Sequence, residues 1–146
     1  MSLDPYRCTV PAEWIDYNGH MSEAFYVLAF GDATTSVMNA LGLDEGYRRS
    51  SACSLYTVEA HVRYLREASL AEELEITTCI VAAGPKKLHL AHEMRRGSEL
   101  IATEEILGLH VDQGTGATTP FPADVLAHIA AHEHRTPDWS GRSITA

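Results

Sequence analysis

The residues best suited to catalysis lie in one short loop. Asp16 and His20 stand at the two ends of the segment DYNGH, and the segment SEA follows one residue later. A helix is expected to begin there, with Ser22 as its N-cap. A carbonyl placed over its first backbone N–H groups, those of Ser22, Glu23 and Ala24, would be polarised by hydrogen bonds and by the helix dipole. With a carboxylate beside it, this arrangement suits acyl transfer.

Each loop residue also has a purely structural interpretation. Asp16 would then only cap the turn formed by Asn18 and Gly19, although we favour the catalytic interpretation. His20 would orient Asp16 or the leaving thiolate, or it would be a packing residue with one satisfied nitrogen, and the sequence favours neither role.

Aromatic residues gather around the same loop. Their ring faces attract quaternary ammonium groups through cation–π contacts, and the acids Glu13 and Glu23 lie close by in the sequence. Trp14 and Tyr17 are better candidates for such contacts than Tyr26, which falls on the apolar face of the predicted helix. The predicted substrate-binding residues are Trp14, Tyr17, Asn18, Gly19, Tyr26, Tyr56 and Glu59. Glu59 would reach the site across a dimer interface, or it would belong to a solvated strand face.

One long helix followed by strands has to position these residues. The helix is predicted from Ser22 to Leu41, after a short strand over residues 6–10. Strands are predicted over residues 53–66, 73–83, 86–96 and 99–112, of which the last three are joined as antiparallel hairpins, and a short helix over 123–134. In the first long strand, alternate residues from Tyr56 to Tyr64 should face the helix. This order predicts an α+β hotdog fold, a curled antiparallel sheet of about five strands around one central helix.

Two segments carry a resemblance to a known family. The segments VPAEWIDYNGHMSEAFYVLAFGDAT and SLYTVEAHVRYLREASLAEELEI resemble hotdog-fold acyl-CoA thioesterases of the 4-hydroxybenzoyl-CoA thioesterase type, and the resemblance extends to about His134. Within that family the chain is most similar to the betainyl-CoA thioesterases associated with carnitine dehydrogenase. Ser22 stands where many members carry Asn, which puts a substrate contact of that amide in doubt.

The resemblance implies hydrolysis of a small acyl-CoA to free acid and CoA, with betainyl-CoA in carnitine catabolism as the best guess. The carboxylate of Asp16 would attack the thioester or activate water. Coenzyme A would be part of the substrate, so no separate cofactor is expected. Two other functions stay open: a hotdog enoyl-CoA hydratase, and a non-catalytic acyl-CoA-binding hotdog module.

Composition limits the remaining possibilities. The 146 residues, 45% of them hydrophobic, predict one domain over 1–134 and a flexible tail over 135–146. A net charge of −9 argues against nucleic acid as a partner, and no apolar run approaches the length of a membrane span. Three cysteines without metal-type spacing predict a reducing cytoplasm.

Metal binding and assembly can also be judged from the pattern. His128 and His132 are four residues apart on a predicted helix, but no third ligand stands at a recognised spacing, so no metal is expected. A curled sheet leaves an edge strand and one face uncovered, which predicts a homodimer or a homotetramer.

Overall fold

The computed structural model describes residues 1–144, which form five strands, three α-helices and one 3-10 turn. The strands are β1 (Tyr6–Thr9), β2 (Cys53–Tyr64), β3 (Glu73–Ala83), β4 (Lys87–Arg96) and β5 (Glu99–Asp112). The helices are a 3-10 turn η1 (Ala12–Trp14), the long α1 (Glu23–Ala40), α2 (Glu45–Ser51) and α3 (Ala123–Ala131).

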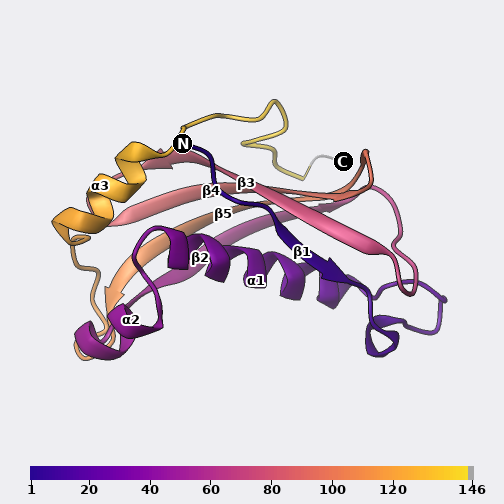
Figure 1. Ribbon diagram of the computed structural model, residues 1–146, viewed down its shortest axis with the longest axis horizontal. Coiled ribbons are helices and arrows are strands. Elements are labelled where there is room, and N and C mark those ends of the chain that lie inside the picture. The colour runs from indigo at the N-terminus through magenta and orange to yellow at the C-terminus, as the bar shows by residue number, and fades with distance from the viewer. Residues whose placement is uncertain (145–146) are drawn as a thin grey trace.

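The five strands form a single antiparallel sheet in the order β1-β3-β4-β5-β2. Figure 1 shows the sheet curving over α1, which runs along its concave face. The strands β3, β4 and β5 follow one another as a meander in the middle of the sheet. The strands β1 and β2, which precede them in the chain, form its two edges. The predicted α+β hotdog fold is confirmed.

The core lies between α1 and the concave face of the sheet. The buried side chains of α1 are Tyr26, Ala29, Phe30, Ala33, Thr34, Val37 and Met38. Those near the start of the helix pack against β1, β3 and the ends of β4 and β5, whereas those near its end pack against the middle of the sheet and α3. One wide apolar face therefore anchors the whole helix, including the end that follows the loop around Asp16.

The predicted facing of β2 is correct only for its second half. A bulge between Thr57 and Glu59 shifts the pairing with β5 by one residue. Leu55 therefore belongs to the core before the bulge and Val62 packs against the core after it, although one is odd-numbered and the other even-numbered. Tyr56, predicted to face the helix, is instead 43% exposed.

The connection between α1 and β2 contains a short helix that is not among the predicted elements. Residues 45–51 form this helix, α2. Asp44 accepts a hydrogen bond from the Tyr47 N–H at 2.9 Å, so it caps this helix. Ser22 does occupy the N-cap position of α1, but its side chain makes no capping hydrogen bond.

One buried polar cluster interrupts the apolar core. His92 of β4 is fully buried, with Nε2 2.9 Å from the Thr34 hydroxyl and Nδ1 2.7 Å from the Thr78 hydroxyl. Because the Thr34 hydroxyl donates its proton to the Phe30 carbonyl, it accepts from Nε2–H, which leaves Nδ1 to accept from Thr78. Burial lowers the pKa of His92 to about 3, so the ring is neutral.

The C-terminal segment runs along the convex face of the sheet. The Trp139 indole N–H donates to Glu93 of β4 at 3.2 Å, and the Gly141 N–H donates to Glu105 of β5 at 2.9 Å. Residues 145 and 146 of the predicted tail lie outside the described part of the chain. The mobility of residues 135–146 and the assignment of 1–134 as one domain stay predictions. No helix within residues 1–144 is long and apolar enough to cross a membrane.

Candidate active site

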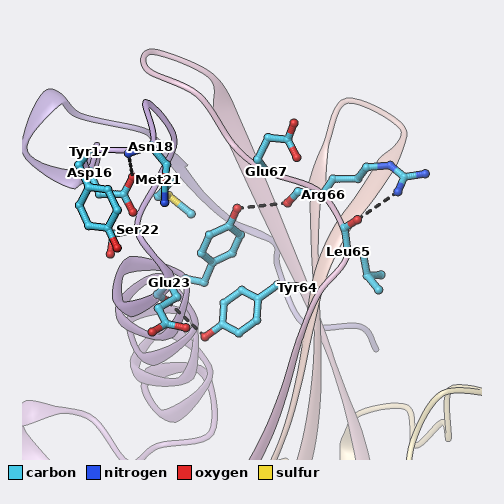
Figure 2. Close-up of a pocket in the computed structure, with 11 residues that line it drawn as sticks. Asp16, Tyr17, Asn18, Met21, Ser22, Glu23, Tyr64, Leu65, Arg66 and Glu67 are labelled. Carbon is cyan, nitrogen blue, oxygen red and sulfur yellow. Dashed lines mark hydrogen bonds between the residues drawn. The ribbon is translucent and has the colours of Figure 1, made fainter.

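A pocket of about 540 Å³ opens where the loop meets the first turn of α1. Its wall comes from two segments about forty residues apart, the loop and helix start on one side and the end of β2 on the other (Figure 2). The lining residues are Asp16, Tyr17, Asn18, Met21, Ser22, Glu23, Tyr26, Tyr64, Leu65, Arg66 and Glu67.

Asp16 holds the loop together and lines the pocket as well. Its Oδ1 accepts the Asn18 N–H at 2.8 Å, and its carbonyl accepts the Gly19 N–H at 2.9 Å. Gly19 has a φ of +79°, which a residue with a side chain rarely adopts. The turn-capping role considered from the sequence is therefore present, and it uses only one carboxylate oxygen. The same hydrogen bond fixes the carboxylate beside the helix start, as Figure 2 shows.

The helix start supplies fewer amide donors than predicted. The Ser22 N–H donates to the Trp14 carbonyl at 2.8 Å, and the Phe25 N–H donates to the Ser22 carbonyl at 3.0 Å. The Ser22 amide must therefore be removed from the predicted oxyanion donors, because its single proton is already used. Glu23 and Ala24 are the residues whose amides can serve a ligand at this helix end.

Two tyrosines form the inner wall of the pocket. The rings of Tyr26 and Tyr64 pack edge to face with centroids 5.1 Å apart. The Tyr26 hydroxyl donates to the Arg66 carbonyl at 3.2 Å and accepts the Ala68 N–H at 3.0 Å, which ties α1 to the chain after β2. The Tyr64 hydroxyl donates to the Glu23 carbonyl at 3.3 Å. The two rings are therefore held in place by the backbone on both sides.

The lining carries more negative than positive charge. Asp16, Glu23 and Glu67 are acidic, and Arg66 is the one basic lining residue within the described chain. The Arg66 guanidinium lies 3.5 Å from the carboxylate of Glu99, which is not part of the pocket lining. A pocket of this charge favours a cationic group over an anionic one.

Several predicted site residues lie away from this pocket. The Trp14 ring stacks on Phe25 at 5.4 Å with an interplanar angle of 12°, and it packs against the core. His20 is half-buried, and its carbonyl accepts the Asp16 N–H at 3.0 Å, so the backbone links these two residues. Tyr56 lies before the bulge of β2, and Glu59 lines a separate pocket together with His89 and Glu105.

The residues that the end of β2 and the segment after it contribute were not predicted from the sequence. Tyr64, Leu65, Arg66 and Glu67 line the pocket, and Met21 lies at its base in the core. A signal for Tyr64 was available, because it ends the strand whose second half was correctly predicted to face the helix. The three residues after it follow no pattern that would place them.

The C-terminal histidines use their ring nitrogens on the backbone. Nδ1 of His128 lies 3.1 Å from the Leu41 carbonyl, and Nδ1 of His132 lies 2.7 Å from the His128 carbonyl. Among residues 1–144 no group of three or more potential ligands could hold a metal ion. The expectation that the protein needs no metal stays a prediction.

Comparisons with known proteins show the family of the chain. Residues 10–129 match the family model of the Thioesterase-like superfamily. The chain is 37% identical to a betainyl-CoA thioesterase of Pseudomonas aeruginosa, over 97% of this chain and 94% of that protein. A Staphylococcus aureus protein solved in complex with CoA superposes with a TM-score of 0.91 and 29% identity, over 100% of this chain and 98% of that one.

Some relatives are much longer. An L-carnitine dehydrogenase/betainyl-CoA thioesterase of Rhizobium meliloti is 38% identical over 92% of this chain, which spans only 28% of that protein. The family match nevertheless covers most of the present chain, from the residue after β1 into the last turn of α3. With its five strands curled around α1, the chain belongs to the Thioesterase-like superfamily.

Proposed function

We propose that the protein hydrolyses a small acyl-CoA thioester to the free acid and CoA, in the pocket at the start of α1. The observation that carries this proposal is the position of Asp16, whose carboxylate is held by the Asn18 N–H beside a helix N-terminus. The thioester carbonyl would lie over the amides of Glu23 and Ala24. Each well-aimed donor of this kind stabilises an oxyanion by roughly 3 to 4 kcal/mol.

Asp16 has two chemically complete routes to the products. As a nucleophile, it adds to the carbonyl carbon and expels CoA thiolate, and water then cleaves the resulting anhydride. As a general base, it takes a proton from a water molecule that adds to the same carbon. Both routes deliver the acyl group to water and a proton to the thiolate.

The substrate we propose is betainyl-CoA, whose acyl group ends in a trimethylammonium cation. The acidic lining and the Tyr26–Tyr64 pair favour such a group, because the ring faces and the carboxylates both attract cations. The names of the relatives from Pseudomonas aeruginosa and Rhizobium meliloti support the same choice.

The geometry favours a thioesterase over an enoyl-CoA hydratase. A hydratase would need Asp16 and a histidine facing the same ligand. The lining of this pocket, within the described residues, contains no histidine, and His20 meets Asp16 through its backbone carbonyl.

We also propose that two chains pair through β2 to form a homodimer, with assembly of two dimers as the larger alternative. β2 is an edge strand of twelve residues with the exposed side chains Tyr56 and Val58 at its centre. Long apolar edges of this kind invite pairing with another chain.

The three cysteines are unpaired thiols in the structure, which supports a reducing compartment such as the cytoplasm.

A hydrolysis screen tests the proposed function. Purified protein is mixed with acyl-CoA esters of similar size, including betainyl-CoA and crotonyl-CoA, and the release of free CoA thiol is followed. We expect thiol release, with betainyl-CoA as the best substrate. Hydration of crotonyl-CoA without thiol release would contradict the proposal in favour of a hydratase.

A further inference from the structure

A buried carboxylate that is not part of the pocket lining lies on the concave face of the sheet. Glu104 of β5 pairs with Val62 of β2 on one side and with His92 of β4 on the other, so its side chain points toward α1. It is only 4% exposed. No hydrogen bond or ion pair from residues 1–144 reaches the Glu104 carboxylate, in contrast to the fully bonded His92 beside it.

The carboxylate oxygens of Glu104 must therefore lie at an opening. Every fully enclosed side-chain nitrogen or oxygen in the described chain has a partner. Since the Glu104 oxygens have none, the small exposed part of this side chain includes the carboxylate oxygens. A charged group in this position is normally paired, because removing it from water without a counter-charge is costly.

The opening lies on the Tyr64 side of Glu104. On the β4 side, His92 and the ring of Phe30 stacked on it close the core. On the β2 side, Ala60 and Tyr64 are exposed. The pKa of Tyr64 is raised by burial first, then by Glu23 and then by Glu104. The Glu104 carboxylate therefore lies within electrostatic reach of this pocket-lining phenol.

The charged and titratable groups around Glu104 supply no counter-ion. His92 is neutral on the β4 side, Tyr64 is a phenol on the β2 side, and Glu23 of α1 is another acid. Burial raises the pKa of Glu104 from 4.5 to about 7. A cation arriving beside Tyr64 would offset this burial cost and favour the ionised form.

We propose that Glu104 is the counter-ion for the cationic acyl group, which binds between this carboxylate and the ring of Tyr64. The proposal rests on the proposed function and names the residue that distinguishes a trimethylammonium group from a neutral group of equal shape. Glu104 does not touch the thioester, and it acts on specificity alone.

The test compares two esters that differ in one atom and therefore in charge. In tert-butylacetyl-CoA, carbon replaces the quaternary nitrogen of betainyl-CoA. We expect Glu104→Gln to lower kcat/KM for betainyl-CoA by about 10- to 100-fold, the low end of the range measured for the loss of a close charge pair. The value for the neutral ester should stay within about threefold. Glu104→Met, which is also uncharged, should give the same pattern.

Glu105→Gln is the matched control. Glu105 is the next residue along β5 and has the same charge, but it faces the convex side, where it bonds with His89 and Gly141. This variant should leave the preference for the cationic ester unchanged. Equal losses on both esters in Glu104→Gln, no loss on either, or the same loss in Glu105→Gln would each overturn the proposal.

A binding experiment separates this proposal from the proposed function. Thioether analogues of the two esters lack the carbonyl, so they bind without being hydrolysed. The wild-type preference for the cationic thioether should increase from about pH 6 to pH 8 as Glu104 ionises, and it should be flat in Glu104→Gln. A preference that rises equally in both proteins would overturn the role of Glu104. If the wild type hydrolyses neither ester, the proposed function fails, while this measurement still decides the role of Glu104.

Discussion

His92 is neutral in the folded protein because it is fully buried, and each of its ring nitrogens has a hydrogen-bond partner. Thr78→Val should remove the hydroxyl proton that Nδ1 accepts while keeping the shape of the side chain. A buried nitrogen without its partner costs about 1 to 3 kcal/mol, so the free energy of unfolding should fall by that amount in urea titrations.

Thr77→Val provides the control for this prediction. Thr77 is the preceding residue of β3 and points to the opposite face, away from His92. Its replacement should change the free energy of unfolding by less than about 0.5 kcal/mol. Equal losses in the two variants would mean that the His92 hydrogen bond adds nothing measurable.

Glu104 should make stability depend on pH in a predictable direction. Its pKa is raised from 4.5 to about 7, so the folded protein disfavours the ionised form. The stability associated with its protonated form is fully present below pH 4.5 and is lost as the pH rises to about 7. Glu104→Gln should therefore gain stability relative to the wild type by up to about 3 kcal/mol between pH 5 and pH 8. Parallel stability curves for the two proteins would contradict this assignment.

The second strand is the element that the sequence pattern describes least well. A strict alternation placed Tyr56 and Tyr64 on the same face, but the bulge after Thr57 reverses the facing of the first half. The bulge arises from pairing with β5, which is far away in the sequence, so no local pattern reveals it. The long helix and the hairpins, by contrast, follow from local periodicity and turn residues, and both were predicted correctly.

The close approach of β2 and β5 depends on Gly108. A Cβ at this position would lie 2.8 Å from Cγ of Leu55, on the neighbouring strand. Gly108→Ala should therefore lower the free energy of unfolding by about 1 to 3 kcal/mol through overpacking. In the double variant with Leu55→Ala, the added methyl group has room. The loss of unfolding free energy in the double variant should therefore be smaller than the sum of the losses in the two single variants.

Gly46→Ala is the matched control for Gly108→Ala. Gly46 lies in α2, and its added Cβ would make only an ordinary contact of 3.5 Å with Asp44. Alanine is also the better helix former, so this variant should keep or slightly raise stability. Strict additivity of Leu55→Ala and Gly108→Ala would contradict the packing explanation.

The candidate site shows what a sequence can and cannot reveal at the scale of the whole molecule. The loop around Asp16 is continuous, and its residue types were sufficient to identify it. Tyr64 and Glu67 reach the same pocket only because the sheet curls around α1 and brings the end of β2 over the helix start. Residues from distant segments meet through the tertiary fold, so the charge of the pocket emerged only from the structure.

The exposed edge of β2 carries the prediction about assembly. Light scattering at micromolar concentration should give at least twice the 16.0 kDa mass of one chain. Val58, which is 53% exposed on this edge, should be intolerant of charge, so Val58→Lys should yield monomers. Leu126→Lys, at an exposed position on α3, is the control and should leave the mass unchanged. A monomeric wild type would contradict the proposed dimer.

The most direct test of the proposed activity is the hydrolysis of betainyl-CoA by Asp16→Asn. The amide keeps the shape of the carboxylate and one oxygen to accept the Asn18 N–H, so the loop and the fold should persist. It can act neither as nucleophile nor as base, so kcat should fall by about 100-fold or more while KM changes little. If the variant keeps most of the wild-type kcat, Asp16 is not the catalytic group and the active site proposed at the start of α1 is wrong.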